Sequence, residues 1–169
     1  MQRFVTTATL FAAVLLAGTV CFAQDAKPEM WDAYKKVREG KWETTLTTAE
    51  GVVVTATLNV EVIFDGKAVL ESATWTSGGG TLNLKGIGNW CPKQKSIVTR
   101  TVDSWGGHSE AVITLADGEE RGSTTLIDAD GTEDSTKSVT TVIDNDTLKV
   151  AFVEGRWAGG GFTWKRKRD

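Results

Sequence analysis

Turn-forming sequences recur at nearly regular intervals along most of this chain, and they restrict its fold more than any other feature. They separate segments rich in Thr and Val, and they are Glu50-Gly51, Asp65-Gly66, Gly78-Gly79-Gly80, Cys91-Pro92-Lys93-Gln94, Gly106-Gly107, Asp117-Gly118, Asp130-Gly131, Asn145-Asp146 and Gly159-Gly160-Gly161. Asp-Gly pairs between strand-forming residues are strong signals of β-hairpins. The spacing predicts about ten strands after Gly40. No long helical segment separates them, which excludes parallel strands joined by helical crossovers.

Apolar and polar residues alternate within the predicted strands. One face of the first long segment holds Val52, Val54, Ala56, Leu58, Val60, Val62 and Phe64, and the later residues Leu148, Val150 and Phe152 alternate in the same way. A series of consecutive hairpins has to protect its edge strands, and closure into a barrel does so most simply. We therefore predict an all-β, antiparallel up-and-down β-barrel of about 8–10 strands. An open sandwich is the alternative, although its strands are usually shorter and joined by crossovers.

Residues 28–38 carry a different pattern, which predicts a short N-terminal helix before the first strand. Pro28 stands in the first turn, acidic residues come early and basic residues come late, as helix geometry and the helix dipole favour. Met30, Tyr34 and Val37 fall on one apolar stripe of such a helix. Gly40 follows as a stop signal.

The first 23 residues have the pattern of a secretory signal peptide. Arg3 supplies a positive charge, an apolar stretch runs over residues 4–20, and residues 21–23 place small side chains at the cleavage site. A retained membrane helix would need about 20 apolar residues, and this stretch is shorter and interrupted by Thr. A lipoprotein anchor at Cys21 would require a small residue in place of Val20. We therefore expect an exported chain, periplasmic or extracellular, without a stable membrane anchor.

The expected organisation is a signal peptide over residues 1–23, a leader with the short helix over residues 24–40, and a β-barrel domain over residues 41–169. Removal of the signal peptide takes one basic residue away and leaves 18 basic against 22 acidic side chains, a net charge of −4. This charge argues against a general nucleic-acid-binding protein. Removal of Cys21 leaves Cys91 alone, so no intrachain disulfide is expected in the mature chain.

The sequence Gly40-Lys41-Trp42 stands where the short helix meets the first strand. A Gly-x-Trp motif in this place, followed by a meander of long hairpins, resembles the opening of the lipocalin and wider calycin barrels. The resemblance implies a lipocalin-like barrel in which the indole of Trp42 closes the floor. It also implies that a basic side chain from the last strand packs over this indole. We assign that structural role to Arg166, because a guanidinium suits cation–π packing.

The pattern over residues 31–168 is also similar to an uncharacterised family of exported bacterial barrel domains of unknown function. The turn and strand markers that carry this similarity are Phe64-Asp65-Gly66-Lys67, Gly86-Ile87-Gly88-Asn89-Trp90 and Asp128-Ala129-Asp130-Gly131. The family implies the barrel fold and no particular chemistry.

Reactive residues are sparse, and we expect no catalytic residues, no metal site and no cofactor. One His and two Cys exclude the usual zinc sites. His108 follows a Gly-Gly turn without a nucleophile elbow for a catalytic triad, and no later His could ligate haem. Basic neighbours would lower the pKa of the Cys91 thiol, but a turn residue is the simpler interpretation. The acidic loop 128–134 lacks the spacing of a Ca²⁺ site, and the basic residues 165–168 fit a solvated terminus with one side chain turned inward.

The seven Trp residues carry most of the information about function. Indoles on barrel strands usually fill the core, and the alternative is a ligand pocket with aromatic walls and a few polar groups. Trp75, Trp90 and Arg100 are the candidate ligand-lining residues. The leading hypothesis is a protein that binds a small, largely apolar molecule in the barrel cup.

Three other interpretations compete with this hypothesis. Exposed indoles in a row on a strand surface would favour a module that binds carbohydrate or another envelope component. An isomerase- or hydrolase-like barrel would require a carboxylate such as Glu61 or Glu71 buried in the cup with a raised pKa. A barrel filled with side chains would have a purely structural role. Nothing in the sequence predicts an oligomeric state.

Overall fold

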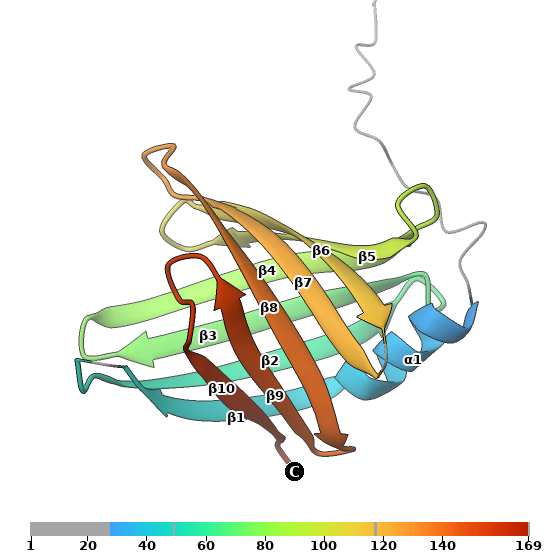
Figure 1. The fold of residues 1–169 in the computed structure, drawn as a ribbon, viewed down its shortest axis with the longest axis horizontal. Coiled ribbons are helices and arrows are strands. Elements are labelled where there is room, and N and C mark those ends of the chain that lie inside the picture. Colours follow the sequence, from blue (N-terminus) through green and yellow to red (C-terminus); the bar gives the residue numbers. More distant parts are fainter. Residues whose placement is uncertain (1–27, 49, 117, 169) are drawn as a thin grey trace, which may run out of the picture.

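The computed structural model describes residues 28–48, 50–116 and 118–168, which form a closed barrel of ten antiparallel strands with a helix at one end (Figure 1). The elements are α1 (Pro28–Arg38), β1 (Gly40–Thr47), β2 (Val53–Ile63), β3 (Ala68–Ser77), β4 (Gly80–Cys91), β5 (Ser96–Asp103), β6 (His108–Ala116), β7 (Glu119–Ile127), β8 (Glu133–Asp144), β9 (Thr147–Glu154) and β10 (Gly161–Arg166). The predicted antiparallel barrel is confirmed, and the sandwich is wrong. The predicted signal peptide lies outside the described residues.

The strands follow one another around the barrel in chain order, and the last returns to the first. Each strand pairs with the next along the sequence, and β1 also pairs with β10, where Trp42 lies opposite Arg166. This closing pair leaves no strand with an open edge, which is the reason for expecting a barrel in the first place.

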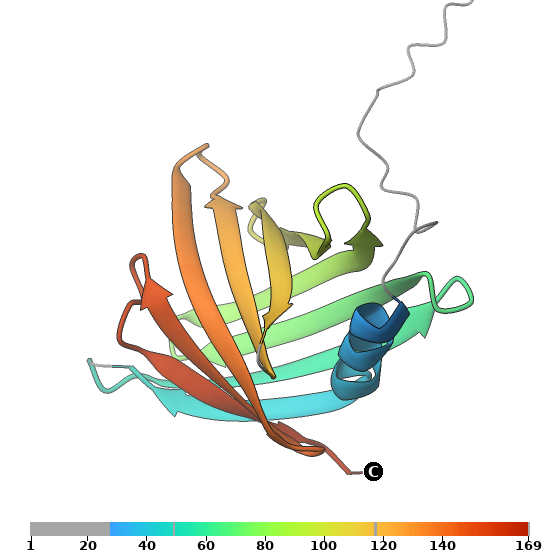
Figure 2. The ribbon, with the colours of Figure 1, turned by 45° about the vertical axis from the view of Figure 1, so that its right-hand side comes forward.

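Helix α1 has the predicted bounds and covers one end of the barrel (Figures 1 and 2). Trp31 and Tyr34 are buried, with ring centroids 5.8 Å apart. The indole Nε1 of Trp31 donates a hydrogen bond of 2.6 Å to the carbonyl of Gly66 in the β2–β3 turn. The predicted stripe of Met30, Tyr34 and Val37 omitted Trp31, although a residue three positions before Tyr34 shares its face. No helix in the described part of the chain is long and apolar enough to cross a membrane.

The two ends of the barrel differ in how they are closed. We call the end covered by α1 the base, and the opposite end the mouth. The mouth is formed by five connections, those of β1–β2, β3–β4, β5–β6, β7–β8 and β9–β10 (Figure 1). At the base, buried barrel side chains pack with the helix in one apolar cluster that contains Trp31, Tyr34, Val60, Val69, Trp90 and Ile97.

The predicted alternation on the first long segment holds within the strand and fails at both ends. The even-numbered residues from Val54 to Val62 are buried or half-buried along β2. Val52 and Phe64 are exposed, because they lie just outside the strand. Phe64 begins the turn, with a φ of 52°, and so leaves the pleat that sets the alternation.

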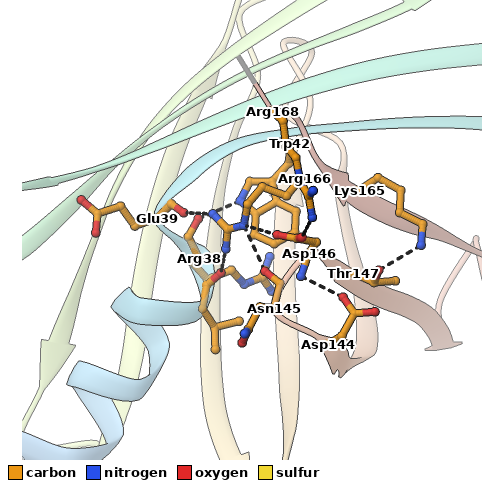
Figure 3. A network of polar contacts seen from close by, with 11 residues as sticks. Arg38, Glu39, Trp42, Asp144, Asn145, Asp146, Thr147, Lys165, Arg166 and Arg168 are labelled. Carbon is orange, nitrogen blue, oxygen red and sulfur yellow. Dashed lines mark hydrogen bonds and ion pairs between the residues drawn. The ribbon is translucent and has the colours of Figure 1, made fainter.

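Trp42 on β1 packs beneath Arg166 of β10 at the base (Figure 3). Its side chain is 1% exposed, and its Nε1 donates to the carbonyl of Arg38 at 2.8 Å. The central guanidinium carbon of Arg166 lies 4.2 Å from the centroid of the indole. The same guanidinium donates to three backbone carbonyls, those of Val37, Glu39 and Asn145. The Gly-x-Trp resemblance implies this arrangement.

Gly40 makes room for this guanidinium. Its φ is +114°, and a Cβ built there would lie 2.6 Å from Nη1 of Arg166. Any other residue would be strained in its backbone and would push Arg166 away from the indole. The motif therefore requires glycine at position 40, because the Arg166 guanidinium lies too close to where a Cβ atom would be.

Cys91, at the end of β4, is buried and disulfide-bonded. The absence of an intrachain disulfide was predicted for the chain without residues 1–23. That prediction does not apply to the full chain, which contains a second Cys.

Candidate functional site

Inward-facing side chains differ in exposure between the two ends of the barrel. Side chains that face inward near the base, such as Val69 and Ile97, are fully buried. Those that face inward nearer the mouth are half-buried, and they include Trp75, Leu82, Leu84, Phe152 and Phe162. These inward-facing side chains therefore keep part of their surface uncovered by other residues of the described chain. The mouth half of the interior is therefore the candidate site.

One side of this interior is aromatic. Trp75 of β3 contacts two rings of β10 edge to face, with centroid distances of 5.4 Å to Phe162 and 5.7 Å to Trp164. Phe152 of β9 lies 5.9 Å from Phe162 and 5.4 Å from Trp157 in the β9–β10 loop. We call Trp75, Phe152, Phe162 and Trp164 the aromatic wall. Such packed rings offer a large apolar surface to a flat or branched ligand.

The opposite side carries hydroxyl groups. Cross-strand pairing places seven short polar side chains of β5 to β8 on the inner face, namely Thr99, Thr101, Ser109, Thr124, Thr136, Ser138 and Thr140. The hydroxyls of Thr101 and Ser109 lie 2.6 Å apart. The interior therefore joins an aromatic side to a side that can donate and accept hydrogen bonds.

Ionisable side chains gather at the base end of the interior. The hydroxyl of Tyr34 donates to Oε1 of Glu71 at 3.2 Å, and Arg38 forms an ion pair with Glu120 in which its Nε donates to Oε2 at 3.1 Å. The Arg38 guanidinium also lies 5.8 Å from the Tyr34 ring centroid. This base cluster of Tyr34, Arg38, Glu71 and Glu120 links the helix to β3 and β7.

Burial governs the pKa values in the base cluster. Loss of hydration raises the pKa of Glu71, with Arg38 and Tyr34 acting in the opposite direction. Burial and the charge of Glu71 raise the pKa of Tyr34. For Arg38, burial disfavours the charged form, but the interactions with Glu120, Tyr34 and Glu71 together outweigh burial and raise the pKa. At neutral pH the phenol and the guanidinium therefore stay protonated.

The three candidate ligand-lining residues have different surroundings. Trp75 is part of the aromatic wall. Trp90 faces inward but is buried in the apolar cluster beneath the helix, and its Nε1 has no hydrogen-bond partner among the described residues. Arg100 does not line the interior, so that prediction is wrong. Its side chain is 53% exposed and forms a 2.8 Å ion pair with Glu110 on the outside of the barrel.

The register explains the misplacement of Arg100. Its two neighbours Thr99 and Thr101 pair with the inward-facing Gly88 and Gly86, so Arg100 must point outward. Sequence reasoning also missed Phe152, Phe162 and Trp164 as a wall. The alternation of Phe162 with Trp164 at the end of the chain was the signal that could have found them.

The raised pKa of Glu71 makes the stability of the folded protein fall as the pH rises. Its pKa is raised in the folded protein, so the stability that the protonated carboxyl provides is fully present below the ordinary pKa and is lost as the pH rises through the raised value. A Glu71→Gln variant stays neutral and should gain stability relative to the unmodified protein as the pH rises above the ordinary carboxyl pKa of about 4.3. Urea denaturation at several pH values measures this difference. The exposed Glu61, replaced by Gln, is the matched control, and a Glu71→Gln difference that does not change with pH would contradict the assignment.

The chain was compared with protein families, curated proteins and solved structures. No protein-family model and no curated protein matches the chain. Among solved structures, it is similar to a de novo designed fluorescence-activating β-barrel, with 12% identity and a TM-score of 0.42 over 79% of this chain and 97% of that chain. That similarity is too low to support an argument about ligands. No group of three or more His, Cys, Asp or Glu among the described residues could hold a metal ion.

Proposed function

We propose that this protein is an exported, lipocalin-like binding protein that holds a small, largely apolar molecule in the mouth half of its barrel. The observation that supports this most directly is the aromatic wall, whose rings face inward and of which Trp75, Phe152 and Phe162 are only half-buried. Apolar surface left wet inside a barrel is stabilised by a ligand that covers it, at about 25 cal/mol per Å². The hydroxyl side of the interior would orient the ligand's polar edge.

The carbohydrate alternative depends on a row of exposed indoles. Trp105 and Trp157 are the two exposed Trp side chains, and they lie on separate loops, β5–β6 and β9–β10. Flat sugar-binding surfaces need neighbouring indoles, so we favour the interior. The enzymatic alternative required an inward carboxylate with a raised pKa, and Glu71 meets that one condition. One carboxylate defines no reaction, and we propose binding alone.

Native mass spectrometry of the protein from an exporting host, compared with its denatured mass, identifies any molecule that it carries. Probe binding then locates the site. The uncharged probe N-phenyl-1-naphthylamine should bind with saturating fluorescence at one probe per chain. Ala73 faces inward between Leu58 and Leu84, so Ala73→Phe should fill the interior and weaken binding by about tenfold or more.

The neighbouring residue supplies the matched control for this variant. Thr74 follows Ala73 on β3, and its hydroxyl donates to Asn83 on the outside of the barrel at 3.0 Å. A Thr74→Phe variant adds the same ring to the outer face and should bind the probe like the unmodified protein. Equal probe affinity in both variants, with circular dichroism showing both folded, would place binding outside the interior and overturn the proposal.

A further inference from the structure

We propose that the molecule held in the interior carries a protonated amine, which the Glu71 carboxylate binds while the aromatic wall contacts the apolar body. This inference rests on the proposed function and deepens it by naming the class of ligand. Three independent features lead to it: the place of Glu71, the pairing of the inward-facing cations, and the charge around the mouth.

Glu71 presents a carboxylate at the floor of the candidate site. It faces inward on β3, opposite Val60 on one side and Gly86 on the other. Its side chain is half-buried, and because it points inward its exposed part meets the interior. Ala73 and Trp75 follow on the same face, and four residues of strand span about 13 Å. A ligand of that length would place one end at Glu71 and the other on the aromatic wall.

The interior offers no cation to an anionic ligand in the part of the chain that the structure describes. Of the two inward-facing cations at the base, Arg38 forms an ion pair with Glu120, and Arg166 lies over Trp42 and donates to backbone carbonyls. A carboxylate ligand would lose its hydration without gaining a counter-charge, and it would approach Glu71. The same interior offers an ammonium a counter-charge in the Glu71 carboxylate, while the aromatic wall contacts the apolar body of the ligand.

The mouth has the charge that would attract a cation. The five mouth connections, each taken with two strand residues on either side, contain one basic residue, Arg156. They contain seven acidic residues, which are Glu50, Asp103, Asp128, Asp130, Glu133, Asp134 and Glu154. Arg156 itself forms an ion pair with Asp134 at 3.1 Å. A ring of like charge around an opening raises the local concentration of ions of the opposite sign and repels those of the same sign.

The groups that face Glu71 support its role as an acceptor. Tyr34 donates to Oε1, which leaves further lone pairs of the carboxylate for a ligand. Arg38 and Glu120, the other charged members of the base cluster, form an ion pair with each other. The raised pKa of Glu71 follows from its burial, and an ammonium nearby would favour the ionised carboxylate again.

Three compounds with the same naphthalene ring system test the charge preference of the site. They are 2-naphthylmethylamine, 2-naphthylmethanol and 2-naphthoic acid. Each competes at pH 7.5 with N-phenyl-1-naphthylamine for the full protein. We expect the amine to bind about tenfold more tightly than the alcohol, and the acid to bind most weakly. In Glu71→Gln the amine-to-alcohol affinity ratio should fall about tenfold. The outer-face variant Glu110→Gln removes an equal charge and should keep the ratio.

The outcomes separate this inference from the proposed function. If the probe and the alcohol bind but the amine has no advantage, or if the acid binds as tightly as the amine, the charge preference is overturned and the binding function stands. An amine-to-alcohol affinity ratio that is unchanged in Glu71→Gln would show that Glu71 does not bind the amine. If neither the probe nor any of the three compounds binds, the proposed function itself fails.

Discussion

A Trp42→Ala variant is expected to lose about 3–5 kcal/mol of unfolding free energy. The substitution removes one of the two largest fully buried side chains and, with it, the surface on which the Arg166 guanidinium lies. It also removes the indole donor of the Arg38 carbonyl, so that a helix terminus loses one of its partners. Equilibrium denaturation in urea measures the loss, followed by both fluorescence and circular dichroism.

The control for this variant removes an equally large side chain from the surface. Trp105 in the β5–β6 turn is 64% exposed, and Trp105→Ala should change the unfolding free energy by no more than about 0.5 kcal/mol. A Trp42→Ala protein that is destabilised as little as Trp105→Ala would show that the indole does not hold the base together. It would also remove the structural basis of the resemblance to lipocalins.

The second large effect is expected at the buried ion pair between the helix and the barrel. Glu120 and Arg38 have side chains that are 5% and 13% exposed. A Glu120→Leu variant leaves the guanidinium buried without a counter-charge and should lose about 3–5 kcal/mol. The double variant Arg38→Met/Glu120→Leu removes both charges and should recover most of that loss.

A double-mutant cycle in urea measures this coupling. The recovery is the decisive quantity, because two unrelated losses would simply add. Additive losses in the double variant would mean that each side chain acts through its own packing. Circular dichroism of the double variant checks that helix α1 is still formed.

The elements of this fold were predictable because they depend on local sequence. Asp65-Gly66 and Asn145-Asp146 mark turns whether or not the rest of the chain is folded, and the turns divide the chain into strands. The helix follows from Pro28 and the charge pattern that comes after it. Closure follows from the same turns, because ten consecutive hairpin strands would otherwise expose two edges.

The candidate site was less predictable because it depends on register and on distant pairs. Thr residues occur on both faces of these strands, so composition does not show which hydroxyls point inward, and Arg100 was placed on the wrong face by one position. The base cluster joins Arg38 to Glu120, which lie 82 residues apart in sequence. No periodic pattern connects such a pair. Only the folded barrel brings the helix against β7.

The contact between β1 and β10 limits the order in which the strand pairings of this barrel can form during folding. Nine of the ten strand pairings join neighbours in sequence and close short loops, so each has a small entropic cost. The tenth joins the two ends of the chain, and 127 residues separate Glu39 from Arg166. Contacts of that separation form late in folding. During synthesis from the N-terminus, the barrel therefore stays an open sheet with two free edges until its last strand emerges.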